Sequence, residues 1–298
     1  MLSAKSPIST APLGDAFTEE TKMPELPEVQ TIVTGLTRLI QTKKIAAISW
    51  NWAKSFPNPA SRVDETIGAS IVASARRGKA ILIHLDQGST LLIHLKMTGQ
   101  LVFQPAGQDG PFPNQSTRVR FDFSDGSSLF FNDFRKFGWI KILPRAELEQ
   151  DAFLSKLGPD PLKQDFTAAR LKDRLGRRGG TIIKAALLDQ TVLAGIGNIY
   201  CDEALFLAGI MPDRRVHSLT EAEIRKLHRS IRKVLRQSIE LGGSTVRNYL
   251  DAEGIRGHYL DQALVYGRNG EPCPICGSLI QKMKVAGRGT HVCTGCQK

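Results

Sequence analysis

The 298-residue chain lacks any long hydrophobic run. No stretch of about 18 apolar residues occurs, which excludes a membrane-spanning helix. Residues 1–22 have neither the apolar core of a secretory signal nor the arginine richness of a transit peptide, and no internal repeat is evident. We therefore expect a globular cytosolic protein, and a length of 298 residues with 41% hydrophobic content predicts two domains plus a small module.

Cysteine is also scarce, and its placement argues against a disulfide scaffold. Four of the five cysteines form the pairs Cys273-x2-Cys276 and Cys293-x2-Cys296, which are separated by 16 residues. In a chain without an export signal this spacing predicts one structural Zn²⁺ held by four thiolates, with no open position for a catalytic water. Cys201 stands alone in a helical pattern, and we expect it to be a small buried apolar residue.

Acidic residues are fewer than basic residues, above all in the second half of the chain. Residues 1–153 hold 17 Lys/Arg and 15 Asp/Glu, a balance of +2, whereas residues 154–298 hold 23 and 14, a balance of +9. A concentrated positive field favours a polyanion such as nucleic acid. Because many basic proteins bind none, the charge by itself leaves the partner open.

The hydrophobic pattern divides the chain near residue 150. Apolar residues recur at helical spacing from Val29 to Ile40, and short apolar or alternating runs separated by turn sequences then predict an antiparallel sandwich. These runs are residues 45–50, 71–75, 80–85, 90–95, 119–123, 128–131 and 139–143. The pattern becomes helical from about Glu147, and its clearest helix extends from Thr220 to Leu241, opened by a capping box. Residues 157–161 contain glycine and proline and are a plausible hinge.

Pro24 and Glu25 lie just before the first predicted helix. Removal of Met23 would leave Pro24 with a free secondary amine beside a carboxylate, a nucleophile next to an acid. As long as residues precede it, the Pro24 nitrogen is an unreactive tertiary amide. Taken alone, Glu25 would be interpreted first as a carboxylate that caps a helix, and the adjacent Pro24 shifts the interpretation towards an acid and base. We expect residues 1–22 to be a leader that is absent from, or removed in, the active protein.

Five ordered motifs resemble the bacterial formamidopyrimidine-DNA glycosylase family over residues 23–298. They are Pro24-Glu25-Leu26-Pro27-Glu28, His94-Leu95-Lys96-Met97-Thr98-Gly99, Asp133-Phe134-Arg135-Lys136-Phe137-Gly138, Gly195-Ile196-Gly197-Asn198-Ile199-Tyr200, and Tyr266-Gly267-Arg268-Asn269-Gly270-Glu271-Pro272. The resemblance implies an α+β multidomain fold. An N-terminal helix and antiparallel β-sandwich would occupy residues 23–150, a helix-two-turn-helix domain 151–264 and a zinc finger 265–298.

The resemblance also implies the activity. The family removes oxidised purines, such as 8-oxoguanine and formamidopyrimidines, from duplex DNA during base excision repair and then nicks the abasic strand, without a nucleotide cofactor. Pro24 would attack C1′ through a Schiff base, and Glu25 would act as the acid and base. Lys79 would donate a proton in β-elimination and contact phosphate, and Arg288 would serve the second, δ-elimination.

Further residues match DNA contacts of the family. Met97, Arg135 and Phe137 resemble the trio that fills the gap left by a flipped base. Lys184 and Asn198 fall at phosphate-binding positions, and residues 251–260 match a loop that closes over the base. The chain also departs from the pattern. Ser116 replaces a contacting histidine, with Arg118 nearby, and Gly180 replaces a basic residue, with Arg177 and Arg178 close enough to compensate. His94 is expected to be structural, and none of the six histidines suggests a metal ligand or a catalytic base.

Three alternatives remain open from the sequence. A protein that keeps its leader would be a non-catalytic binder of damaged DNA. An endonuclease VIII type would prefer oxidised pyrimidines, although Leu26 and the Met97, Arg135 and Phe137 trio argue against it. A zinc-finger transcription factor would leave the Pro24 motif unexplained. We expect a cytoplasmic, nucleoid-associated bacterial monomer that acts on double-stranded DNA with oxidised purines or abasic sites, without a membrane partner.

Overall fold

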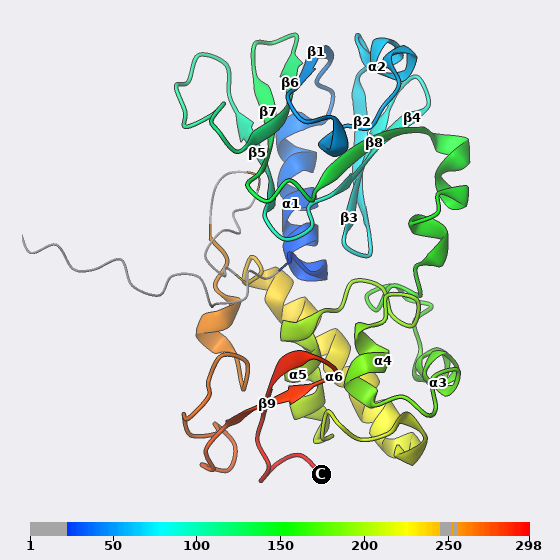
Figure 1. Ribbon diagram of the computed structural model, residues 1–298, viewed down its shortest axis with the longest axis vertical. Helices are drawn as coiled ribbons and strands as arrows, with labels where there is room; N and C mark the ends of the chain where they lie inside the picture. Colours follow the sequence, from blue (N-terminus) through cyan, green and yellow to red (C-terminus); the bar gives the residue numbers. More distant parts are fainter. Residues whose placement is uncertain (1–22, 245–251, 253–255) are drawn as a thin grey trace, which may run out of the picture.

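The computed structural model describes residues 23–244, 252 and 256–298. A β-sandwich lies at one end of the molecule, and a helical part with a small terminal hairpin lies at the other (Figure 1). The helices are α1 (Leu26–Ile40), α2 (Ala60–Thr66), α3 (Ala168–Gly176), α4 (Ile183–Leu188), α5 (Asn198–Ala208) and α6 (Glu221–Glu240), with 3-10 turns at Ala53–Ser55, Arg145–Gln150, Leu154–Lys156, Val216–Ser218 and Tyr259–Gln262. Every helix in the described ranges is too short or too polar to cross a bilayer.

Two four-stranded antiparallel sheets form the sandwich, in the orders β1-β6-β7-β5 and β2-β3-β4-β8. Their strands are β1 (Ile45–Trp50), β2 (Ile71–Arg77), β3 (Ala80–Leu85), β4 (Ser89–His94), β5 (Gly99–Gln104), β6 (Thr117–Phe123), β7 (Ser128–Asp133) and β8 (Trp139–Pro144). The predicted antiparallel sandwich is confirmed. The sequence pattern missed β5, because its apolar run is only Leu101, Val102 and Phe103.

Helix α1 joins the cores of the two halves of the molecule. Its first residue, Leu26, belongs to the core of the helical part, whereas Val29 and later apolar residues of α1 belong to the core of the sandwich. The backbone N–H of Leu26 also donates to the carbonyl oxygen of Gly195 at 2.9 Å, just ahead of α5. The start of α1 is therefore fixed to the helical part, while the rest of the helix packs against strands (Figure 1).

The long helix α6 begins as its sequence predicts. The Thr220 hydroxyl accepts from the N–H of Glu223 at 3.2 Å, and the Glu223 carboxylate accepts from the N–H of Thr220 at 2.8 Å. The apolar stripe of α6, which includes Leu227, Ile231 and Val234, lies in the same core cluster as α5. This leaves the opposite, charged face of α6 outside the core.

The chain ends in a two-stranded hairpin of β9 (Gln281–Val285) and β10 (Arg288–Val292). Its two connecting residues, Ala286 and Gly287, have φ values of 51° and 72°, the left-handed conformation that a tight hairpin turn requires. Arg288 is the first residue after this turn, so its position depends on the turn and on the way the hairpin is docked.

Candidate active site and DNA-binding surface

Glu25 lies at the junction of the two halves of the molecule. It precedes α1, and its side chain is only 3% exposed. One carboxylate oxygen, Oε1, accepts from the backbone N–H of Ile199 at 3.1 Å, in the first turn of α5. The first N–H groups of a helix have no partner within the helix, so this carboxylate caps α5, in addition to its place in the capping box of α1. The other oxygen, Oε2, is buried without a hydrogen-bond partner among the described residues.

Gly197 brings Lys79 to the same point. A Cβ atom on Gly197 would lie 2.3 Å from Cδ of Glu25 and 2.7 Å from Nζ of Lys79, closer than any real contact. Both side chains therefore pack on the bare backbone at the start of α5. Lys79 belongs to the turn between β2 and β3, which presents it across the domain boundary. The structure thus brings Glu25 and Lys79 together, as the predicted catalytic roles require.

The electrostatics of this pair suit proton transfer. Burial raises the pKa of Glu25 from 4.5 to about 7, against the opposing effect of Lys79 and with a smaller contribution from the nearby Glu28 carboxylate. Burial likewise lowers the pKa of Lys79, with Glu25 and Glu28 opposing this change and Arg288 reinforcing it. A carboxyl group that titrates near neutral pH can act as an acid or a base there.

Pro24 immediately precedes Glu25 and is buried. Its nitrogen is bonded to Met23 in the chain as described, so it has no free amine in this state. Because Glu25 is adjacent in the chain, exposure of the Pro24 amine would place it next to a carboxyl group that is already positioned.

Glu28 is an organising residue that sequence reasoning did not single out. Its carboxylate accepts from the N–H of Glu25 at 2.8 Å, from the N–H of Ser244 at 2.6 Å and from the Tyr200 hydroxyl. These donors come from the start of α1, from the residues after α6 and from α5. The only signal in the sequence was its place in the motif that contains Pro24. Glu28 holds three segments together around the candidate catalytic carboxyl group.

Met97, Arg135 and Phe137 lie together at one end of the sandwich. A guanidinium nitrogen of Arg135 lies 3.2 Å from the Met97 sulfur, and its central carbon lies 5.0 Å from the Phe137 ring centroid. Phe137 is 54% exposed, and the neighbouring Phe134 is 81% exposed. Exposed aromatic rings of this size are unusual unless a partner covers them. The three predicted gap-filling residues therefore form a single group, in which Arg135 and Phe137 are exposed and Met97 is half-buried.

Asp133 builds the loop that carries Arg135 and Phe137. Its buried carboxylate accepts from the N–H of Arg135 at 3.2 Å, from the N–H of Gly138 at 2.6 Å and from the Thr98 hydroxyl. Thr98 is next to Met97, so one carboxylate fixes both loops of the group. Asp133 stands inside a motif that the sequence analysis quoted, but its role depends on contacts between the two loops.

Four cysteines converge at the base of the terminal hairpin. Their sulfur atoms all lie within 4.8 Å of one another, with Cys273 and Cys296 3.8 Å apart and Cys276 and Cys293 3.4 Å apart. Four thiolates at about 2.3 Å from a tetrahedral zinc ion would be about 3.8 Å apart, so the residues fit this ion. The predicted cofactor, one structural Zn²⁺, is confirmed. The ion would pin the ends of the hairpin and has no position left for substrate.

Buried polar contacts dock this hairpin on the helical part. The ammonium of Lys184 in α4 contacts Asp202 Oδ1 at 2.5 Å and the Thr290 hydroxyl at 2.7 Å. Asp202 Oδ2 accepts from the N–H of His291 at 2.9 Å, and the Asn198 amide donates to the Gly289 carbonyl at 2.9 Å. These contacts hold β10, and with it Arg288, beside the start of α5. Arg288 is exposed and close enough to affect the charge of Lys79.

Several predicted DNA contacts have other partners in this structure. Lys184 is fully buried, and Arg118 is 7% exposed with its guanidinium bonded to the Asp133 and Thr117 carbonyls. In this structure Lys184 supports the terminal hairpin and Arg118 supports the loop that begins at Asp133, and their predicted contacts with DNA stay predictions. Arg178, in contrast, is exposed and pairs with Asp189 at 2.8 Å. Asn198 is half-buried and holds the hairpin through its amide.

The remaining predictions concern residues without a catalytic role. Cys201 is fully buried in α5, as predicted, and burial raises the pKa of its thiol. His94 is buried, accepts from the N–H of Lys96 at 3.0 Å, and has a pKa lowered by burial to about 3, which fits the predicted structural role. The predicted closing loop covers residues 251–260, and its positions 251 and 253–255 lie outside the described residues.

Comparison with known proteins places the chain in a family. The Formamidopyrimidine-DNA glycosylase N-terminal domain matches residues 23–140, the H2TH domain of the same family matches 157–249, and the zinc finger found in FPG and IleRS matches 270–298. Formamidopyrimidine-DNA glycosylase of Bacillus subtilis is 40% identical over 92% of this chain and 99% of its own length. The enzyme of Pelotomaculum thermopropionicum is 45% identical over 93% of this chain and 99% of its own length.

Solved structures agree with these relatives. The MutM (Fpg) protein of Thermus thermophilus is 37% identical, with a TM-score of 0.82 over 92% of this chain and 98% of that chain. A Lactococcus lactis FPG variant in complex with DNA that contains Fapy-dG is 36% identical, with a TM-score of 0.85 over 92% of this chain and 100% of that chain. Three matched domains in the order of the fold show that this chain belongs to the formamidopyrimidine-DNA glycosylase family.

Proposed function

We propose that this protein is a bifunctional DNA glycosylase and abasic-site lyase that removes oxidised purines, including 8-oxoguanine and formamidopyrimidines, from duplex DNA in base excision repair. Its family supports this activity, as do relatives solved with DNA that contains Fapy-dG, carbocyclic 8-oxo-G or an abasic site. We further propose a cytoplasmic, nucleoid-associated monomer whose domains divide near residues 150 and 264.

In the proposed reaction the free amine of Pro24 attacks C1′ of the damaged nucleotide. The glycosidic bond breaks, and its electron pair leaves with the base, which takes up a proton. Glu25 protonates the sugar ring oxygen, so the ring opens and an iminium joins Pro24 to C1′. The iminium withdraws electrons and makes the C2′ proton acidic. Loss of that proton expels the 3′-phosphate, and a second elimination expels the 5′-phosphate.

Lys79 and Arg288 lie where the second stage needs charge. With a pKa lowered by burial, Lys79 gives up its proton more readily than an exposed lysine, which suits a donor in β-elimination. Arg288 is a permanent cation beside it and suits the phosphates next to the lesion. Met97, Arg135 and Phe137 would fill the stack that the damaged nucleotide vacates, which offsets part of a flipping cost of about a few kcal/mol.

One observation carries this proposal: a buried carboxyl group with a pKa of about 7 directly follows Pro24 and shares the bare backbone of Gly197 with Lys79. A capping carboxylate alone would need neither a raised pKa nor an ammonium in contact with the same glycine. The arrangement supplies an acid, a second proton donor and a latent amine at one point.

Borohydride trapping tests the identity of the nucleophile. We expect a chain that starts at Pro24 to form a covalent adduct with lesion-containing duplex DNA, with the adduct on Pro24 in a peptide map. A matched chain that retains Met23 should bind the same duplex and form no adduct, because its Pro24 nitrogen is an amide. An adduct at any lysine, or none from the trimmed chain, contradicts the proposal. The intact mass of the protein from its own host would show which form exists there.

A further inference from the structure

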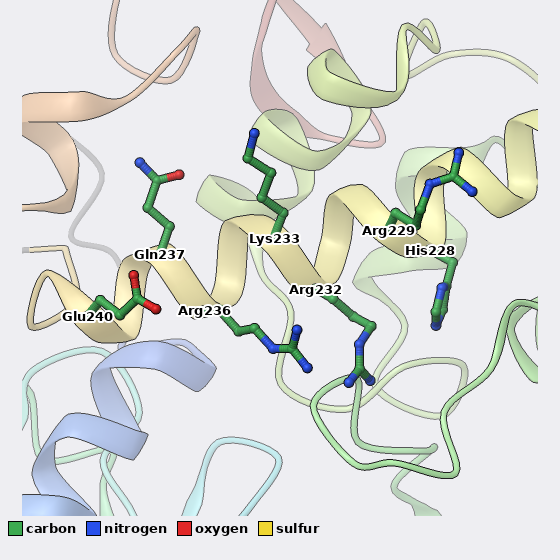
Figure 2. A pocket seen from close by; sticks show the side chains of 7 residues that line it. All are labelled: His228, Arg229, Arg232, Lys233, Arg236, Gln237 and Glu240. Carbon is green, nitrogen blue, oxygen red and sulfur yellow. The ribbon is translucent and has the colours of Figure 1, made fainter.

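A second strongly basic surface lies on α6, on the side of the helix that faces away from the core. It is a groove of about 590 Å³ lined by His228, Arg229, Arg232, Lys233, Arg236, Gln237 and Glu240, all from α6. Figure 2 shows Arg229 and Lys233 extending to one side of the helix axis and Arg232 and Arg236 to the other. The side chains that line the groove therefore extend to both sides of the exposed face of α6.

The groove is separate from the candidate active site. The buried positions of α6, such as Leu227, Ile231 and Val234, pack in the same core as α5, whose first turn carries the site. On a helix of 3.6 residues per turn, Arg229, Lys233 and Arg236 lie on the opposite side from these positions. The body of α6 therefore stands between the groove and α5. None of the predicted DNA contacts lies in the groove.

Three of its cations have no partner among the described residues. Arg229, Lys233 and Arg236 are exposed, and no ion pair or hydrogen bond from any of them occurs there. The neighbouring Arg225, by contrast, pairs with Glu221 on the same helix. Like charges on adjacent turns of a helix repel one another, so this face carries a cost that an anion would remove.

Arg232 has a different role from the other three. Its guanidinium donates to the carbonyl oxygens of Pro161 at 2.8 Å and of Lys163 at 2.9 Å, in the segment that links the two halves. His228 similarly lies 2.8 Å from the Phe166 carbonyl oxygen. These bonds fix one wall of the groove on the linking segment, so its shape does not depend on α6 alone.

We propose that this groove binds the phosphate backbone of a second segment of duplex DNA while a first segment occupies the active site. The positions from 229 to 236 span about 10 Å along the helix, a length of duplex axis over which one strand carries about three phosphate charges at about 3.4 Å of axis per charge. A duplex is stiff over about 150 base pairs, so a straight duplex in the active site cannot also reach the far side of α6. The choice of DNA as the partner rests on the proposed function.

Two differently labelled short duplexes test this proposal on the full chain. The first carries a non-cleavable abasic-site analogue and saturates the active site; the second is undamaged and is titrated by fluorescence anisotropy. We expect the second duplex to bind the complex, and three phosphate contacts predict a slope of about −2.7 in log affinity against log salt. Its affinity should therefore fall by about 40-fold between about 50 and about 200 mM salt.

Variants of the groove separate charge from shape. R229Q/K233Q/R236Q should lose at least about tenfold in affinity for the second duplex and most of the salt slope. R229K/R236K keeps the charge and should bind within about twofold of the parent, and E240Q removes the one acidic side chain of the groove and should bind more tightly. K44Q removes an exposed charge outside the groove and is the control for a simple loss of positive charge.

The outcomes distinguish this inference from the proposed function. If the first duplex fails to bind while the second duplex binds, the result counts against the proposed function and leaves the groove proposal standing. Failure of the second duplex to bind at low salt, or equal binding by R229Q/K233Q/R236Q, overturns the inference. Tighter binding of inorganic tripolyphosphate than of duplex at equal phosphate concentration would identify a small-anion site and also overturn it. Capture of an acidic peptide in place of duplex DNA would overturn it as well.

Discussion

At the scale of single residues, the candidate active site depends on one missing side chain. Gly197 has no Cβ, and Glu25 and Lys79 occupy the space that it would take. The motif around Gly197 resembles that of a phosphate-binding turn, and the sequence suggested no more than that. The structure adds a second reason for glycine here, which is the close approach of an acid and an amine from two other segments.

The pH dependence of base excision follows from Glu25. Its pKa of about 7 means that the carboxyl group is protonated below that pH and has lost its proton above it. In a chain that starts at Pro24, we expect the single-turnover excision rate to fall about tenfold per pH unit above about pH 8, where the terminal amine, with an ordinary pKa of about 7.7 to 8.0, is already neutral and only the protonated fraction of Glu25 still decreases. E25Q should be slower by a factor of about 10² to 10⁴ and should lack this limb. Persistence of the limb in E25Q would assign it to another group.

The raised pKa of Glu25 also makes the stability of the folded protein depend on pH. The folded pKa of about 7 exceeds the ordinary value of 4.5, so folded Glu25 holds a proton that the unfolded chain has already released between these pH values. As pH rises through this window, the unfolded chain is stabilised by releasing the proton that folded Glu25 keeps, so the free energy of unfolding falls, and the loss is complete above about pH 7. A buried acid retained at such a cost is typical of functional sites.

At the scale of elements, the terminal hairpin determines the position of Arg288. Zinc holds its base, the turn at Ala286 and Gly287 sets its tip, and Lys184 and Asp202 dock its side. Together these three features hold Arg288 close enough to Lys79 to affect its charge. The Lys184 side chain is buried in an ion pair with Asp202, and its predicted contact with phosphate stays a prediction.

Removal of zinc tests this dependence. Chelation should unfold the hairpin, because four thiolates cannot stay close without the ion, while the helical circular dichroism from α6 persists. We expect strand cleavage to be lost and one Zn²⁺ per chain to restore it. C296S should abolish zinc binding, whereas C201S, the control, should keep one Zn²⁺ because Cys201 lies in the core of α5. Full strand cleavage by zinc-free protein would contradict this role.

The sequence predicted elements well where the pattern was local. The α6 capping box and seven of the eight sandwich strands follow from residues close together in the chain, since periodicity and turn chemistry are local properties. The short apolar run of β5 was too weak a signal. Glu28 and Asp133 were not identified as organisers, because their partners are distant in sequence and only the fold brings them together.

At the scale of the whole molecule, an ion pair couples the two halves. Arg76 in β2 contacts Asp160 of the linking segment at 2.7 Å, with side chains 6% and 14% exposed. Arg76 also donates to Gln30 of α1 at 3.0 Å and to the Gly78 carbonyl at 3.0 Å, next to Lys79. The link between the halves therefore reaches the turn that carries a candidate proton donor.

Removing one partner of this pair should destabilise the protein. D160A would leave Arg76 buried without its counter-ion, and we expect it to lower the free energy of unfolding by about 3 kcal/mol. D173A breaks an exposed pair with Arg177 and should change it by less than about 0.5 kcal/mol. Urea unfolding measures both. Similar losses for the two variants would show that the Arg76 pair contributes no more than a surface contact.

The sequence by itself determined the family, the zinc ligands, the sandwich and the residues able to carry the chemistry. Motifs, ligand spacing and periodicity depend only on residues that are close together in the chain. Tertiary structure alone decided that Glu25 caps α5 and has a raised pKa, that Lys184 is buried, and that three exposed cations of α6 have no partner among the described residues. These properties depend on burial and on charges brought together from distant segments, and neither quantity exists until the chain has folded.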